Sequence, residues 1–206
     1  MDLFEQDAML ESMQILVDTR EQDTERALKR YDTFGAPYSR ATLSYGDYCY
    51  NAKLPSGEWL FDTEQVISAP IVIERKMSLD ELAMCFTKGR DRFEREFQRA
   101  KANNARIFLL IENATWENLL NGRYRSRFNH NAFLASLAAW IVRYDLQLIF
   151  CKEETSGRLI KEFLYRDLKE RIGRGEYDTG RDHDDDQGAT TGEVHGAHGH
   201  GSKDGV

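Results

Sequence analysis

The chain has 206 residues, enough for one domain with a full hydrophobic core, and it carries 28 Lys and Arg against 35 Asp and Glu. The net charge of −7 argues against a protein that coats nucleic acid without specificity, and no apolar run approaches the roughly 18 residues that span a membrane. The three cysteines are widely scattered, which excludes a disulfide framework and a CxxC zinc site. The first residues, MDLFEQDAMLES, lack the basic segment of a signal peptide, so a cytoplasmic location is expected.

Strand and helix patterns alternate along the chain. Residues 1–12 are expected to form a flexible arm. The patterns predict strands at 13–19, 41–54, 58–63, 70–76, 105–112 and 146–151, and helices at 25–34, 78–102, 130–144 and 156–172. This alternation predicts an α/β fold in which helices cover both faces of a central mixed sheet. Ser78 is the expected N-cap of the helix that follows the fourth predicted strand.

The last 34 residues differ from the rest. Residues 173–206 hold nine of the 15 glycines and eight acidic residues against three basic ones. Such a segment buries too little apolar surface to fold alone, so we expect a disordered Gly/Asp/His-rich tail after a folded domain at 13–172.

Carboxylates stand at or just beyond three of the predicted strands, at Asp18, Asp47 and Glu74. Alternation along residues 70–76 places Glu74 and Lys76 on one face of their strand and Arg75 on the other. Charged side chains on an apolar strand are costly unless they face solvent, a metal or each other. Acids that hold Mg²⁺ or Mn²⁺ beside a lysine suit metal-assisted phosphodiester cleavage. The alternative is structural, because Asp18 and Glu21 also suit the cap of the next helix.

In this order the residues resemble the XPF family of structure-specific DNA endonucleases, a branch of the PD-(D/E)XK superfamily, whose motif is GDx(n)ERKx(3)D. The motif appears as Gly46-Asp47, Glu74-Arg75-Lys76 and Asp80. Upstream, residues 17–21 (VDTRE) resemble the family's VDxRE strand end, and downstream Gly89-Arg90 resembles its GR element, with Arg92-Phe93 as an alternative match.

The resemblance implies a restriction-endonuclease-like fold of α/β/α layers, Mg²⁺- or Mn²⁺-dependent DNA cleavage and, often, dimerisation. Carried over by residue, Asp47 and Glu74 become metal ligands and Lys76 orients the attacking water. Asp18 and Asp80 become further acids around the metal, bound directly or through water. Arg20, Arg75 and Glu21 are further members of the site, with a structural ion pair as the alternative for Arg75.

Many family members add a tandem helix-hairpin-helix module, and no such segment follows residue 172. The sequence therefore looks like a stand-alone nuclease domain of the kind found in phages and mobile elements, which would act in the cytoplasm of a bacterial or phage-infected cell.

Two basic segments are candidates for DNA contact. In the helix predicted at 78–102, one stripe carries Lys88, Arg92, Arg95 and Arg99, while Arg90 falls on the apolar stripe and is expected to point toward the carboxylates or the scissile phosphate. A predicted loop carries Arg123, Arg125 and Arg127 around Tyr124, a pattern that suits phosphate contact and base stacking. Solvated helix and loop surfaces are the alternative.

The helix predicted at 130–144 is apolar nearly all round between residues 131 and 142, so it needs cover on most sides. Either neighbouring helices or a second subunit supplies it, and a homodimer through this helix and the last one is one expectation. The expected function is a metal-dependent endonuclease acting on branched or flapped DNA in replication, recombination or repair. A catalytically inactive DNA-binding or dimerisation partner and a restriction-type nuclease are the alternatives.

Overall fold

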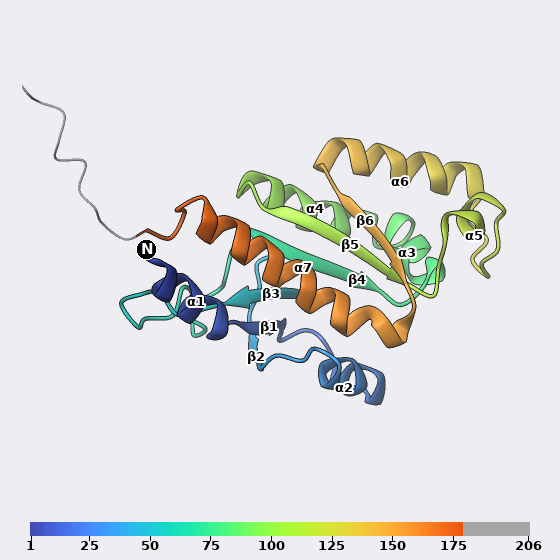
Figure 1. Cartoon of the computed structure of the whole chain (residues 1–206). Helices are drawn as coiled ribbons and strands as arrows, with labels where there is room; N and C mark the ends of the chain where they lie inside the picture. Colours follow the sequence, from blue (N-terminus) through green and yellow to red (C-terminus); the bar gives the residue numbers. More distant parts are fainter. Residues whose placement is uncertain (179–206) are drawn as a thin grey trace, which may run out of the picture.

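The structure, a computed structural model, describes residues 1–178 (Figure 1). Within them, one six-stranded sheet has the strand order β2-β1-β3-β4-β5-β6. The strands are β1 (Gln14–Asp18), β2 (Tyr38–Ala41), β3 (Tyr48–Asn51), β4 (Ile71–Lys76), β5 (Arg106–Glu112) and β6 (Gln147–Cys151). Strand β3 runs antiparallel to β1 and β4, whereas the β1–β2, β4–β5 and β5–β6 pairs are parallel. The sheet is therefore mixed, as predicted.

Helices cover both faces of the sheet (Figure 1). One face carries α1 (Leu3–Glu11), α2 (Glu25–Asp32) and α7 (Glu153–Gly173), and the other carries α3 (Leu79–Phe86), α4 (Arg90–Ala102), α5 (Trp116–Leu120) and α6 (His130–Tyr144). Each face has its own buried apolar cluster. This arrangement confirms the predicted α/β/α layers. No helix within the described residues is long and apolar enough to cross a membrane.

Strand β4 contributes side chains to both layers. Val72 belongs to the cluster under α3, α4 and α6, whereas Ile71 and Ile73 belong to the cluster under α1, α2 and α7. Because side chains alternate along a strand, Glu74 and Lys76 lie on the face of Val72 and Arg75 on the opposite face. The strand therefore divides its three charged residues as predicted.

The N-terminal segment differs from the expected flexible arm. Asp2 caps helix α1 in a reciprocal capping box with Glu5, and Met9 is buried against the α7 side of the sheet. The terminal ammonium of Met1 pairs with Asp178 at 2.7 Å. Residues 3–11 thus form a capped helix that is anchored to the domain by Met9. The predicted disorder of the tail concerns mainly residues 179–206, which lie outside the described residues.

Three predicted elements are corrected. The strand expected at 41–54 is shortened to β3, and the chain before it forms the separate strand β2. The helix expected at 78–102 is two helices, because the chain leaves helical geometry at Thr87 and the Gly89 amide turns back to the Met84 carbonyl at 3.0 Å. The strand expected at 58–63 is reduced to an isolated bridge between Lys53 and Trp59. In its place, the Asn51 side chain accepts from the Phe61 amide at 3.0 Å and donates to its carbonyl at 2.9 Å.

Candidate active site

Three strands bring acidic residues to one edge of the sheet. Strand β1 ends at Asp18, β3 begins just after Asp47, and β4 ends with Glu74 and Lys76. Since β3 is antiparallel to both neighbours, its start lies beside their ends: the Asp18 amide donates to the Asp47 carbonyl, and the Asp47 amide donates to the Ile73 carbonyl, both at 2.9 Å. The predicted convergence of these strand ends is therefore present.

Gly46 makes room for Asp47 at this edge. Its φ of +72° is a left-handed conformation that side chains disfavour, and a Cβ on it would lie 2.7 Å from the Cβ of Val72. The close approach to β4 lets the Asp47 carboxylate accept a hydrogen bond of 2.7 Å from the Arg75 amide. The Gly-Asp pair therefore has a steric reason: only glycine brings the aspartate this near to the β4 backbone.

Glu74 and Lys76 form a buried ion pair at the end of β4. Burial and the neighbouring Asp47 charge raise the pKa of Glu74 to about 8. Burial alone would lower the pKa of Lys76, but the Glu74 and Asp47 carboxylates outweigh it and raise that pKa above its usual value. The Lys76 ammonium also lies 5.2 Å from the centre of the Phe93 ring. The Glu74 and Asp47 carboxylates thus both stabilise the charge of the buried Lys76 ammonium.

This donor set fits a hard divalent cation. Asp47 and Glu74 supply carboxylate oxygens, which Mg²⁺ and Mn²⁺ prefer. Among residues 1–178, no three His, Cys, Asp or Glu side chains are close enough to enclose a metal ion by themselves. Two protein carboxylates with water completing the shell is a common arrangement for Mg²⁺.

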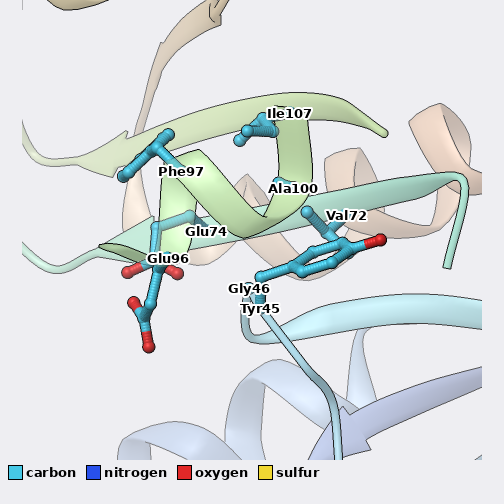
Figure 2. A pocket seen from close by; sticks show the side chains of 8 residues that line it. All are labelled: Tyr45, Gly46, Val72, Glu74, Glu96, Phe97, Ala100 and Ile107. Carbon is cyan, nitrogen blue, oxygen red and sulfur yellow. The ribbon is translucent and has the colours of Figure 1, made fainter. Parts of the chain in front are cut away.

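Glu96 is a further acid at the site that the sequence patterns did not reveal. It shares a small pocket with Glu74 between α4 and β4 (Figure 2). Glu74, Lys76 and Glu96 also line an open cavity of about 310 Å³ with Lys88 and Arg92. The charge of Glu96 adds to the rise in the pKa of Glu74.

Asp18 is almost completely buried and binds its surroundings through both oxygens. It accepts from the Leu43 amide at 2.8 Å, and from the amide and the Nε of Arg20 at 2.7 Å each. The Arg20 guanidinium reaches on to Glu96 at 3.1 Å. Thr24, not Asp18, caps α2. Asp18 therefore holds the β1 end and Arg20 in place, and its predicted metal contact stays a prediction.

Arg75 joins a buried network on the opposite face of the sheet. Its guanidinium pairs with Glu112 at 3.2 Å and with Glu21 at 3.5 Å. Arg30 binds the other Glu112 oxygen at 3.1 Å and the Tyr48 hydroxyl at 3.1 Å, and that hydroxyl donates to Glu21 at 3.3 Å. Burial and the Asp47 charge raise the pKa of Glu21. The structural ion pair expected as the alternative for Arg75 is present.

The partners Arg30, Tyr48 and Glu112 were not predicted, although signals for two of them exist. Glu112 ends β5 as Glu74 nearly ends β4, so the strand-end pattern applies to it equally. Arg30 falls on the same helix stripe as the buried Ala27 and Phe34, where a guanidinium requires a partner.

Asp80, in the first turn of α3, binds the loop that precedes α6. One carboxylate oxygen accepts from the backbone amides of Arg125 and Ser126 at 2.7 Å each, and the other pairs with the Arg125 guanidinium at 3.3 Å. The structure thus joins the last motif residue to the loop before α6. Its predicted place among the acids around the metal stays a prediction.

The predicted basic stripe begins at Lys88, just before α4, continues along α4 and faces solvent. Its members Lys88, Arg92, Arg95 and Arg99 are all exposed. Arg90, by contrast, lies over the ring of Trp140 at 5.9 Å, so the expected direction toward the carboxylates is corrected. The electron-rich face of an indole partners a guanidinium without a carboxylate.

Helix α6 is only partly covered. Its buried side chains are Phe133, Leu137, Trp140 and Tyr144, whereas Ala135, Ala138, Ala139 and Val142 are exposed. Val142 alone is 85% exposed. The described domain thus leaves one apolar face of this helix open, as the sequence pattern suggested.

Comparisons with known proteins agree with the fold. Residues 17–163 match the family model of the ERCC4 domain. Two similar solved structures are XPF from Aeropyrum pernix (TM-score 0.53, 19% identity, 80% of this chain and 69% of that chain) and XPF from Aeropyrum pernix in complex with DNA (TM-score 0.52, 22% identity, 76% and 65%). The chain thus spans about two thirds of these structures, which share its fold. No curated protein matches the sequence.

Proposed function

Because the chain belongs to the ERCC4 domain family, as a nuclease domain of the XPF type, we propose that it is a Mg²⁺- or Mn²⁺-dependent DNA endonuclease. The observation that carries the proposal is the buried Glu74–Lys76 pair beside Asp47 at one edge of the sheet. Families of one fold serve many chemistries, so the argument rests on this site and not on the fold alone.

In the proposed mechanism, Asp47 and Glu74 hold the metal, which when bound activates water and neutralises charge on the phosphate. The Arg75 amide fixes Asp47 by its hydrogen bond of 2.7 Å. Lys76 neutralises Glu74 in the metal-free site and is placed to orient water or to stabilise the charge that develops on the phosphate. Phe93 beside the ammonium excludes water from one side and strengthens these charge interactions.

DNA is the proposed substrate, and branched or flapped DNA in replication, recombination or repair is the finer proposal. One solved structure with this fold is described as a complex with DNA. Exposed lysine and arginine side chains run from Lys88 along α4, and two of them, Lys88 and Arg92, line the site cavity with Glu74; they would provide a positive path for DNA toward the site.

Of the two alternatives, an inactive partner is disfavoured, because this chain keeps both carboxylates and the lysine. A restriction-type nuclease would use the same chemistry and is separated only by its substrates. A homodimer through α6 and α7 is also proposed on account of the open apolar face of α6. Light scattering that finds only monomer at micromolar concentration would contradict the dimer. Action in the cytoplasm of a bacterial or phage-infected cell stays part of this proposal.

The decisive experiment is cleavage of flap, fork, four-way junction and linear duplex DNA with Mg²⁺, with Mn²⁺ or with EDTA. We expect the wild type to cleave in either metal, and Glu74→Gln to bind DNA without cleaving it. Glu117→Gln, an exposed glutamate of α5, is the control and should match the wild type. Cleavage that persists in EDTA, or in the Glu74→Gln variant, would refute the proposal.

A further inference from the structure

The loop between α5 and α6 has a regular alternation of side chains. Its arginines at 123, 125 and 127 are exposed, whereas Tyr124, Ser126 and Phe128 are half-buried. The Tyr124 and Phe128 rings pack on Phe133 of α6 with ring centres 5.5 and 5.3 Å apart. The loop therefore turns its apolar side chains toward the core and its three arginines outward.

Internal hydrogen bonds hold this loop in one conformation. The Tyr124 hydroxyl donates to the Phe128 carbonyl at 2.7 Å, and the Ser126 hydroxyl accepts from the Phe128 amide at 3.2 Å. Because the Tyr124 ring is packed and its hydroxyl is bonded, it is not free to stack on a base. The exposed groups of this loop are its three guanidinium groups, and base stacking by Tyr124 stays a prediction.

Asp80 supplies the one carboxylate that fastens this loop to α3. Its two short hydrogen bonds from the Arg125 and Ser126 amides are charge-assisted and stronger than ordinary backbone bonds. Asp80 follows Lys76 by four residues, at the second position of α3. Through it, the loop is connected by a short rigid segment to the strand that carries Glu74 and Lys76.

Resting on the proposed function, we propose that residues 123–128 are a pre-ordered contact site for the DNA phosphate backbone and that Asp80 is its positioning residue. Arg123, Arg125 and Arg127 bind phosphates and carry no base readout, since the loop has no free aromatic face. Asp80 holds these arginines in register with the site at the end of β4. Its task concerns DNA and not the metal.

Asp80 affects DNA affinity in two ways, through its negative charge and through the hydrogen bonds that anchor the loop. Two variants separate these effects. Asp80→Asn removes the charge but keeps a side-chain oxygen for the two amides, whereas Asp80→Ala removes both. Removing a negative charge near the arginines raises DNA affinity equally in both variants. The difference between them isolates the anchor, because they have the same net charge.

The experiment measures the affinity for a short duplex in EDTA by fluorescence anisotropy at several salt concentrations. We expect Asp80→Ala to bind on the order of five- to tenfold more weakly than Asp80→Asn, because the free loop must be ordered on binding. When the three arginines are also replaced by glutamine, the two Asp80 variants should bind the duplex with equal affinity. The slope of log affinity against log salt concentration should then be smaller in magnitude by up to about 2.7 than with the arginines present. Thermal unfolding of each variant confirms that it is folded.

A second experiment tests whether Asp80 binds the metal instead. It measures Mn²⁺ binding to the DNA-free protein from the spin-resonance signal of free Mn²⁺. Both Asp80 variants should bind Mn²⁺ like the wild type, while Glu74→Gln binds it more weakly. Equal DNA affinity of Asp80→Ala and Asp80→Asn, or loss of Mn²⁺ binding in both, would overturn the inference and leave the proposed nuclease function intact. A wild type that binds neither duplex nor Mn²⁺ would overturn both.

Discussion

The buried network on the far side of β4 gives the sharpest prediction. Glu112 is completely buried, and each of its oxygens binds a different arginine, Arg30 at 3.1 Å and Arg75 at 3.2 Å. Replacing Glu112 with Gln keeps the shape but leaves two guanidinium groups with no anion between them. Arg30 then loses its only anionic contact within the described residues, and Arg75 keeps only the longer contact to Glu21 at 3.5 Å.

The magnitude follows from the burial of the whole network. Removing one partner of a buried ion pair costs about 3–5 kcal/mol of unfolding free energy, because the remaining charge stays desolvated. For a domain of this size each kcal/mol corresponds to roughly 2–4 °C, so Glu112→Gln should lower the unfolding midpoint by roughly 6–20 °C. Gln offers one carbonyl oxygen, so one arginine keeps a neutral hydrogen bond and the loss falls toward the lower end.

Urea and thermal unfolding, followed by far-UV circular dichroism, measure this loss. The matched control is Glu25→Gln, which breaks the exposed pair with Lys29 and should leave the unfolding midpoint unchanged. If Glu112→Gln unfolds with the same free energy as the wild type, the network contributes nothing and its assignment as a stabilising element is wrong.

Three further predictions concern the site itself. Mn²⁺ at 100 times the Kd measured at pH 8.5 should add about 2.7 kcal/mol to the unfolding free energy of the wild type but not of Glu74→Gln. Because burial raises the pKa of Glu74 to about 8 and the metal needs the ionised carboxylate, the same Mn²⁺ concentration should add less at pH 6.5, and an equal gain at both pH values would contradict the assignment. Lys76→Met should cleave DNA ~10²–10⁴-fold more slowly with unchanged duplex affinity in EDTA, and cleavage near the wild-type rate would remove Lys76 from the mechanism. Gly46→Ala should lower the free energy of unfolding by about 1–3 kcal/mol and weaken Mn²⁺ binding, because the new Cβ meets Val72. The control is Gly35→Ala, at a similar φ of +63° but with open space around it, which should leave Mn²⁺ binding unchanged.

The sequence was sufficient to predict those features that depend on the residue pattern of a single strand or helix. Alternation along β4 placed Glu74 and Lys76 on one face and Arg75 on the other without knowledge of any neighbour. The apolar pattern of β5 likewise predicted a central strand covered by two helical layers. These patterns depend on local geometry, which a short segment determines by itself.

Contacts between distant segments could not be predicted in this way. Arg30 and Glu112 are separated by 82 positions, and only the folded sheet brings them together. Helix α1 depends on its packing near α7, and Asp80 meets Arg125 only because the loop before α6 folds back over α3. In each case the local pattern was compatible with several partners, and tertiary packing selected one.

Arg75 shows how the two faces of the sheet depend on each other. Its amide holds Asp47 on the side of the proposed metal, while its guanidinium is held by Glu112 and Glu21 on the other side. A guanidinium has a planar fork of donors that contacts two carboxylates at once, which the single ammonium of a lysine does less well. The middle residue of the Glu-Arg-Lys run therefore fixes the backbone at the end of β4, and through its amide it fixes the carboxylate that its neighbours need. The buried network thus supports the site without contacting the substrate.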